Sequence, residues 1–368
     1  MNFKSFLLSV ISGLLLLNVT TSNACTIFRL KAKDGSFMIV RSMEFALDMN
    51  YQVIVVPRNT PLQSPFTEES GGMKWQNKYG YVGVTSLGMT YAINDGMNEQ
   101  GLAIGLLWYE ADMTWQKVTP ADSNIALAQA MFCDWVLGNF SSVEEVKDEL
   151  PNIKVFGYQD PVSKLKPTVH FIVYDTKGDC MVIEYNEGTY KVYDNPLGIM
   201  TNAPEFPYHM QNLRNYIGMN SSNPSSHMQS KLNLKPTGHG AGFWGLPGDY
   251  TPPSRFIRLA VLTSYADQQA DAKSNLNLGQ HLINTFDIPF GIITEEGPGN
   301  KIYKESTQWV SFRDLAEKSF YFRTYDNFTL RKIELDKIDL SKAGIRVYSM
   351  KDSEQSIIDI TEDGVSDK

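Results

Sequence analysis

Cys25 is the residue whose position points most clearly to chemistry, because it directly follows Ser-Asn-Ala at 22–24, at the end of an apolar leader. Lys4, the apolar stretch 6–19 and the small residues at 22 and 24 have the layout of an export signal that is cut after Ala24. The cut would make Cys25 the first residue of the mature chain, so one residue would carry both a thiol and a free α-amine. The apolar stretch is shorter than the about 20 residues that a transmembrane helix needs. We therefore expect 1–24 to be a signal peptide and the protein to be periplasmic or secreted, without a membrane anchor.

A cysteine at a new N-terminus has two chemical uses. In bacterial lipoproteins it is acylated and serves as an anchor, but their signals usually place Leu three residues before the cysteine, where this sequence has Ser22. In the other use, the α-amine is the general base for the thiol of the same residue. An α-amine titrates at about pH 8 and a thiol at about 8.5, so a proton moves between them at little cost. The residues themselves leave two classes open, a lipid-anchored binding protein acylated on Cys25 and an enzyme with Cys25 as nucleophile.

The elements that must position this cysteine follow from periodicity and turn residues. The sequence predicts strands near both ends of the chain and in its middle, at 25–30, 36–45, 51–57, 79–86, 169–175, 180–186 and within 307–335. Helical spacing of apolar residues predicts helices at 124–140, 142–150, 255–269 and 278–287. The segment 94–101 (NDGMNEQG) is predicted as a turn between two strands. Strands at both ends with helices between them indicate a layered α+β body in which both termini join the sheets.

Composition and residue spacing give little support to several other function classes. The chain has 368 residues and a formal net charge of −8, with no basic run and no interleaving of basic and aromatic residues, so we expect no nucleic-acid partner. No G-x-S-x-G elbow is present, and the glycine-rich segment 238–242 lacks the Lys-Ser/Thr of a phosphate loop. No metal site and no cofactor are predicted, because no two of the five histidines have ligand spacing: His170, His209, His227, His239 and His281.

Two other cysteines leave an alternative open. Cys133 and Cys180 could form a disulfide in an oxidising compartment. The simpler interpretation is that each is a small buried side chain, since Cys133 lies in an apolar helical run and Cys180 in a predicted strand.

Four segments in order along the chain carry a resemblance. They are CTIFRLKAKDGSFMIVRSMEF from Cys25, NDGMNEQGLAIGLLWY from Asn94, GIMTNAPEF from Gly198 and GLPGDYTPPSRFIR from Gly245. Together they resemble the N-terminal nucleophile hydrolases, and more specifically the choloylglycine hydrolase family, which contains bile salt hydrolases and penicillin V acylases. The resemblance implies a four-layer αββα sandwich and a single domain over 25–368.

The resemblance also implies roles for particular residues. Cys25 would be the nucleophile and its α-amine the base. Arg41 would lie beside the thiol, where a positive charge favours thiolate. Glu44 stands where the family usually has Asp and would orient the α-amine, so the carboxyl is one methylene further from the backbone than usual.

Three later residues complete the implied catalytic set. Asn202 corresponds to the asparagine that donates to the oxyanion. Trp108 stands where bile salt hydrolases have Asn and some penicillin acylases have Tyr, and the backbone N–H of this position would be the second oxyanion donor. Arg255 corresponds to an arginine of the charge network around the thiol.

The substrate implied by the resemblance is a small-molecule acyl amide with a bulky apolar acyl group. The predicted pocket residues are Met43, Phe45, Trp108, Tyr109, Phe243 and Trp244. Trp108 and the segment 238–258 favour a penicillin V acylase-like enzyme, with conjugated bile salts as the second substrate class and N-acyl homoserine lactones as the third. Members of the family are often tetramers, so a homotetramer is implied, with 203–235 as the segment available for its contacts.

Overall fold

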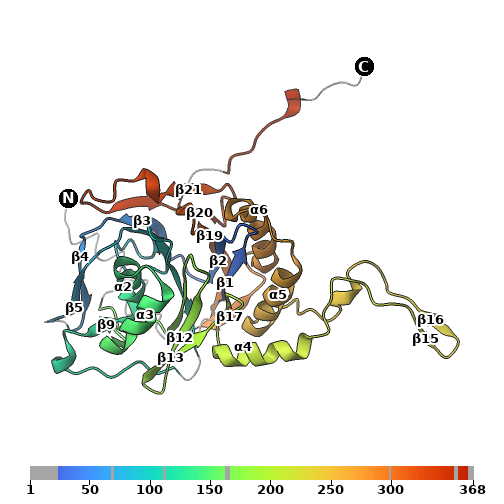
Figure 1. Cartoon of the computed structure of the whole chain (residues 1–368), viewed down its shortest axis with the longest axis horizontal. Helices are drawn as coiled ribbons and strands as arrows, with labels where there is room; N and C mark the ends of the chain where they lie inside the picture. The colour runs from blue at the N-terminus through green and yellow to red at the C-terminus, as the bar shows by residue number, and fades with distance from the viewer. Residues whose placement is uncertain are drawn as a thin grey trace.

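Two antiparallel sheets stacked face to face form the centre of the molecule (Figure 1). The computed structural model describes residues 24–67, 70–110, 113–161, 166–297, 300–351 and 355–363. The predicted signal peptide lies outside these residues except for Ala24. Within the described part of the chain, no helix is long and apolar enough to cross a membrane.

The first sheet has six strands and carries the N-terminal strand in its interior. Its order is β14 (Ile199–Met200), β1 (Cys25–Lys31), β2 (Phe37–Phe45), β19 (Ser306–Asp314), β20 (Ser319–Thr324) and β21 (Arg331–Glu334). Residues 25–45 thus share one sheet with residues 306–334, as the strand pattern at both ends predicted.

The second sheet has eight strands. Its order is β13 (Thr189–Asp194), β12 (Cys180–Asn186), β11 (Val169–Tyr174), β8 (Ala103–Trp108), β7 (Asp95–Asn98), β6 (Tyr81–Thr85), β3 (Gln52–Val56) and β22 (Arg346–Ser349). Smaller pairs flank the sheets: β4 (Pro61–Pro65) with β5 (Gly71–Gln76), β9 (Ala126–Ala128) with β10 (Lys154–Phe156), β15 (His227–Gln229) with β16 (Leu232–Leu234), and β17 (Thr294–Gly297) with β18 (Lys301–Lys304).

Helices cover the outer face of each sheet. On the six-stranded sheet, α5 (Pro252–Tyr265) packs over β1 and α6 (Ala272–Ile283) packs over β2. Gly279 permits the close approach of α6, because a Cβ there would lie 2.9 Å from Cγ2 of Val40. On the eight-stranded sheet, α2 (Phe132–Asn139) packs over β7 and β8, with α3 (Val143–Glu149) following it. The predicted four-layer αββα sandwich is therefore confirmed, and α4 (Phe206–Asn212) lies against α5.

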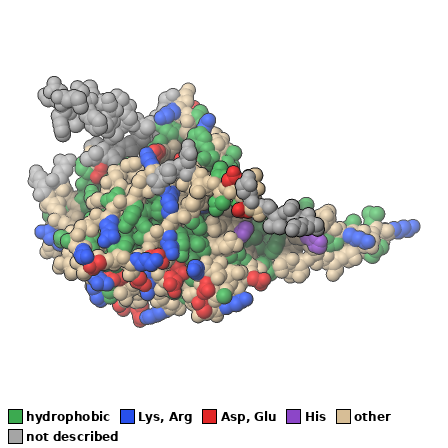
Figure 2. Space-filling view, turned by 90° about the horizontal axis from the view of Figure 1, so that it is seen from above, with side chains coloured by type: hydrophobic (Ala, Val, Ile, Leu, Met, Phe, Trp, Pro, Cys, Tyr) green, Lys and Arg blue, Asp and Glu red, His purple; other side chains and the backbone are tan. Residues whose placement is uncertain are grey.

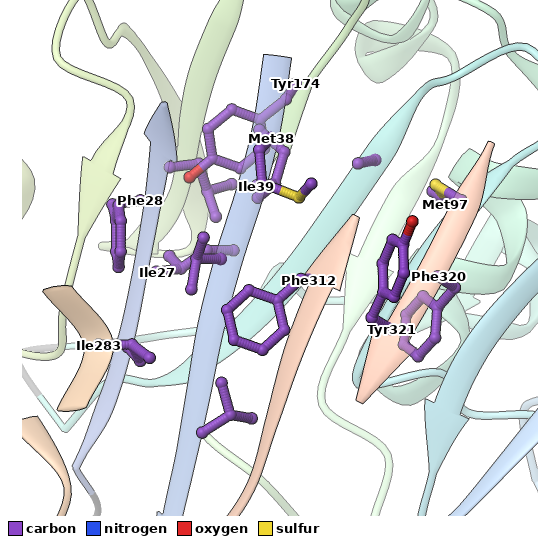
Figure 3. Packing of buried hydrophobic residues seen from close by; sticks show 14 of the residues in the cluster. Ile27, Phe28, Met38, Ile39, Met97, Tyr174, Ile283, Phe312, Phe320 and Tyr321 are labelled. Atoms are coloured by element: carbon purple, nitrogen blue, oxygen red, sulfur yellow. The ribbon is translucent and has the colours of Figure 1, made fainter. Parts of the chain in front are cut away.

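Apolar side chains fill the space between the layers (Figure 3). Every residue of β2 from Phe37 to Glu44 is buried, because one face of the strand meets the helices and the other meets the second sheet. Phe312 of β19 and Tyr174 of β11 belong to the same core cluster although they come from different sheets. Strands covered on both faces read as nearly continuous apolar runs, which is why the sequence identified them.

Two sequence-based assignments gave the wrong type of element over part of their range. Residues 95–98 form strand β7, and the turn after it is confined to 99–102, where the Asn98 side chain accepts the N–H groups of Gln100 and Leu102. The predicted helix 124–140 begins only at Phe132, because residues 126–128 form strand β9, which pairs in parallel with β10, and a 3-10 turn at 129–131 follows. In both cases pairing with a distant strand overrode the local signal.

Cys133 and Cys180 are both free and buried. Cys133 lies on α2 and Cys180 begins β12, so the interpretation as small buried side chains is confirmed.

Candidate active site

Cys25 is the first residue of β1 and lies opposite Met43 of β2. Its side chain is only 1% exposed, and its Sγ lies 3.5 Å from Sδ of Met43. Ala24 still precedes Cys25 in this structure. The Cys25 nitrogen is therefore a backbone amide here, at the position of the α-amine that cleavage after Ala24 would create. That nitrogen donates to Oδ1 of Asn202 at 2.8 Å. The nitrogen and the sulfur of Cys25 are thus both held in place at the buried start of β1.

Asn202 follows β14, the strand next to β1. Its Oδ1 accepts from the Cys25 nitrogen and from Nη2 of Arg255, the latter at 2.6 Å. Its Nδ2 donates one proton to the carbonyl of Trp108 at 2.8 Å. An amide nitrogen has two donors, and no described residue accepts the second one. Three hydrogen bonds therefore fix the Asn202 side chain, and one N–H of its amide remains available as a donor.

Arg255 enters the site from the first turn of α5 and is fully buried. Its Nη1 donates to the carbonyl of Cys25 at 2.5 Å and to Oγ1 of Thr26 at 2.6 Å. Its Nε donates to the carbonyl of Tyr250 at 2.8 Å. These bonds tie α5 to the first two residues of β1.

Arg41 projects from β2 into the space between the two sheets. Its Nη1 lies 3.4 Å from Oδ1 of Asp95 on β7, and its Nη2 donates to the carbonyl of Leu106 at 2.5 Å. The guanidinium also lies over the ring of Trp309, at 5.2 Å from its centroid. Arg41 is thus a buried cation with fixed partners rather than a member of a surface ion pair.

The electrostatics of the thiol combine opposing effects. Burial raises the pKa of Cys25, and the positive charge of Arg41 is the largest influence that lowers it. Glu44 raises the pKa further, while the backbone N–H of Trp108 and the charge of Arg255 lower it. The net direction is upward, because desolvation outweighs the nearby cations.

Glu44 lies on the opposite face of β2 from Arg41 and Met43, since successive side chains of a strand alternate. It accepts from Oγ1 of Thr307 at 3.3 Å, and its Oε2 is buried without a partner among the described residues. Burial raises the pKa of Glu44 to about 8, against the opposing charge of Arg255. With Ala24 attached, the carboxyl is therefore largely protonated at neutral pH.

The structure brings only part of the predicted pocket to the thiol. Met43 touches it, and Phe45 follows two residues later on the same strand. Tyr109 is fully buried and stacks on His170 at 4.6 Å, so it is packed inside the core. Phe243 packs on Tyr265, which is ten residues or about 15 Å along α5 from the arginine of the site. Trp244 is 84% exposed beside it.

Several residues of the site were missed by sequence reasoning. Asp95 anchors Arg41 but lies in the segment that was interpreted as a turn. Thr307 reaches Glu44 from a strand more than 260 residues away. His209 bonds to the backbone of Asn202, although it had been considered only as a possible metal ligand. No local signal marks these residues, because their partners are distant in sequence.

A cavity of about 420 Å³ lies between residues 287–289 and the strands β19 and β20. Its lining includes Thr307, Val310, Arg323 and Phe328 but not Cys25. Thr307 connects the cavity to Glu44, and Trp309, which also lines it, packs against the guanidinium of Arg41.

The fold and the site together define the class. A buried cysteine begins the first interior strand of an αββα sandwich, with its nitrogen held by an asparagine amide and its carbonyl by a buried arginine. This is the arrangement of an N-terminal nucleophile hydrolase.

Comparison with known proteins identifies the family. The model of the linear amide C–N hydrolases, choloylglycine hydrolase family, matches residues 25–359. A bile salt hydrolase/transferase from Clostridium perfringens is 32% identical over 330 residues, covering 88% of this chain and 96% of that protein. A penicillin V acylase from Pectobacterium atrosepticum is 25% identical over 356 residues, covering 90% and 86%. The chain belongs to the choloylglycine hydrolase family and is an enzyme that hydrolyses C–N bonds of linear amides.

Solved structures agree on the fold. A variant of the conjugated bile acid hydrolase from Clostridium perfringens superposes with a TM-score of 0.81 at 28% identity, covering 92% of this chain and 100% of the other. The penicillin V acylase from Agrobacterium tumefaciens shares the fold with a TM-score of 0.71 at 22% identity, covering 88% and 90%.

Proposed function

We propose that this enzyme hydrolyses the amide bond of conjugated bile salts. The observation that carries the proposal is the similarity to a bile salt hydrolase over nearly the whole of both chains, at 32% identity. A second bile salt hydrolase/transferase, from Lactiplantibacillus plantarum, is 29% identical over 320 residues. The penicillin V acylase is more distant at 25%. The comparisons therefore favour the second substrate class of the sequence analysis over the first.

The site supports a mechanism in which Cys25 supplies both nucleophile and base. After removal of Ala24, the α-amine takes the thiol proton, and the thiolate attacks the amide carbonyl carbon. The second Nδ2–H of Asn202 and the backbone N–H of Trp108, which already lies by the sulfur, donate to the oxyanion. The C–N bond then breaks, and the ammonium returns its proton to the leaving amine. Water, activated by the amine, hydrolyses the remaining thioester.

Processing would also change the state of Glu44. The backbone N–H of Glu44 donates to the carbonyl of Ala24 at 2.9 Å, so the residue lies beside the bond that is cut. A new ammonium group close by favours carboxylate and lowers the pKa of Glu44. In the mature enzyme Glu44 would then accept a hydrogen bond from the amine and orient it.

The first test is hydrolysis of glycodeoxycholate and taurodeoxycholate, followed by release of glycine and taurine. We expect release by the wild type and none by Cys25→Ser. Penicillin V is assayed beside them through 6-aminopenicillanic acid. Preference for penicillin V, measured as kcat/KM, would contradict the bile salt proposal and restore the acylase expectation.

Export and processing are proposed on the leader sequence. Intact mass of the exported protein tests them, since a chain starting at Cys25 has a free amine. A lipid-sized increase on Cys25 would instead support the anchored binding protein, because an acylated amine cannot act as the base.

We also propose self-assembly through the arm that carries β15 and β16. The arm projects from the body (Figure 1), and Figure 2 shows hydrophobic side chains along it. Met228, Leu232 and Leu234 are exposed on this hairpin. An isolated two-stranded hairpin is marginally stable in water, so contact with another copy would stabilise it. This is the part of segment 203–235 on which the tetramer expectation depends.

A further inference from the structure

Two buried histidines bond to the backbone carbonyls of two consecutive residues, the second of which is Asn202. Nε2 of His170 lies 3.0 Å from the carbonyl oxygen of Thr201, and Nε2 of His209 lies 2.8 Å from that of Asn202. Both histidine side chains are fully buried. Neither takes part in the mechanism above.

The partners fix the protonation of His209. A carbonyl oxygen only accepts, so Nε2 carries a proton. Nδ1 is buried and has no partner among the described residues. Burial lowers the pKa of His209 to about 4. The ring is therefore neutral, with its single proton directed at the carbonyl of Asn202.

His170 is oriented by a carboxylate on the neighbouring strand. Its Nδ1 lies 3.2 Å from Oε1 of Glu184, and the same oxygen accepts the backbone N–H of Phe206 at 2.9 Å. A carbonyl oxygen only accepts, so Nε2 of His170 donates to Thr201, while the Glu184 carboxyl on the other side of the ring fixes its orientation.

Aromatic stacking holds both rings in plane. The ring of Tyr109 stacks on His170 at 4.6 Å with an interplanar angle of 12°. The ring of Phe256, the residue after Arg255 on α5, stacks on His209 with a centroid distance of 4.8 Å and an interplanar angle of 18°. The donors cannot turn away from their carbonyls without unpacking the core.

The two carbonyls flank the Asn202 backbone, so their directions set where the Asn202 side chain points. That side chain forms hydrogen bonds of 2.6 to 2.8 Å with the Cys25 nitrogen, Arg255 and the carbonyl of Trp108, so a small rotation would break them. We propose that His170, held by Glu184, and His209 are positioning residues that keep the Asn202 amide aimed at the oxyanion. The proposal rests on the function proposed above.

The test replaces His209 by Phe, which keeps the stacking on Phe256 and removes only the donor. We expect kcat for glycodeoxycholate to fall about tenfold to a hundredfold, less than loss of an oxyanion donor itself, with KM changed less than about twofold. His209→Gln places an amide N–H within reach of the carbonyl, and we expect it to restore most of kcat. Alkylation of Cys25 by iodoacetamide does not use an oxyanion and should keep its rate.

The matched control is Tyr174→Phe. It removes a buried bond of 3.1 Å to the carbonyl of Gly198, three residues before Thr201, without touching Asn202. We expect a similar loss of stability in both variants but a loss of kcat only in His209→Phe. Equal kcat in the two variants, or no recovery in His209→Gln, would overturn the proposal.

A readout without substrate separates this inference from the proposed function. In the crystal structure of His209→Phe we expect Oδ1 of Asn202 beyond hydrogen-bond distance of the Cys25 nitrogen, and in Tyr174→Phe within it. An unmoved Asn202 would overturn the positioning role. If the wild type released neither glycine nor taurine, the bile salt proposal would fail, and the two structures would still decide the role of His209.

Discussion

At the residue scale, burial and nearby positive charges act in opposite directions on the pKa of the Cys25 thiol. Burial raises its pKa, and Arg41 is the strongest opposing influence. Arg41 shares Asp95 with Arg313, which lies 2.8 Å from the same carboxylate oxygen. Removal of Arg41 therefore leaves Asp95 paired, so the electrostatic effect on the thiol can be measured by itself.

We expect Arg41→Met to raise the pKa of Cys25, because the nearest favourable charge is lost. The rate of iodoacetamide alkylation at pH 7 should fall about tenfold, the change in thiolate that one pKa unit gives. Arg41→Lys keeps the charge and should fall less. Cys25→Ser supplies the background from the two buried cysteines. An unchanged pH profile in Arg41→Met would mean that the cation does not act on the sulfur.

In the unprocessed chain, which retains Ala24, Glu44 makes the free energy of unfolding depend on pH. Its pKa is raised from 4.5 to about 8 in the folded state. Between these values the unfolded chain loses the proton while the folded chain keeps it, so stability falls as pH rises, by up to about 1.4 kcal/mol per pH unit. Glu44→Gln mimics the neutral carboxyl and should flatten this slope.

Urea unfolding at pH 5 and pH 7.5 measures the effect. Glu144→Gln removes an exposed carboxyl on α3 and serves as the control, with the slope of the wild type. A slope that persists unchanged in Glu44→Gln would assign the pH dependence to other groups.

At the element scale, the two sheets approach closely at Gly105 of β8, beside the ion pair of Arg41 and Asp95. A Cβ on Gly105 of β8 would lie 3.0 Å from Cδ1 of Ile27 and 3.2 Å from both Nη1 of Arg41 and Oδ1 of Asp95. All three neighbours are buried and the last two are bonded to each other. Because Gly105 has no side chain, Arg41 and Asp95 can form their ion pair directly beside it.

We expect Gly105→Ala to destabilise the fold by about 1–3 kcal/mol through overpacking. Gly218→Ala is the control, because Gly218 is exposed and has no atom within 4 Å of the added Cβ. Urea midpoints of the two variants give the comparison. Equal stability would show that the sheets separate without strain.

At the scale of the whole molecule, the arm with β15 and β16 stands apart from the layered body (Figure 1). Leu232, 65% exposed, lies on one of its strands and Met228 on the other. If copies assemble through the arm, charges at these positions would face an apolar partner surface, which is costly.

We expect the double variant Met228→Lys and Leu232→Lys to shift the mass in light scattering from an oligomer toward the monomer. Ile302→Lys places the same charge on an exposed residue of the body and should keep the mass of the wild type. An oligomer that persists in the double variant would place the contact elsewhere.

The sequence by itself determined the strands with strong apolar patterns, the buried state of Cys133 and Cys180, and the family. Those features depend on local periodicity or on motifs with fixed spacing, as in the segment that begins at Cys25. The sequence also named Arg41, Glu44, Asn202 and Arg255, which the structure brings together around this cysteine.

The tertiary structure alone decided the features that depend on distant partners. It made 95–98 a strand by pairing it with β6 and β8, and placed Phe243 and Trp244 at the far end of α5. It also brought His209 to the Asn202 carbonyl. Neither burial nor the direction of a side chain toward a residue far along the chain is a local property, so only the packed layers could fix them.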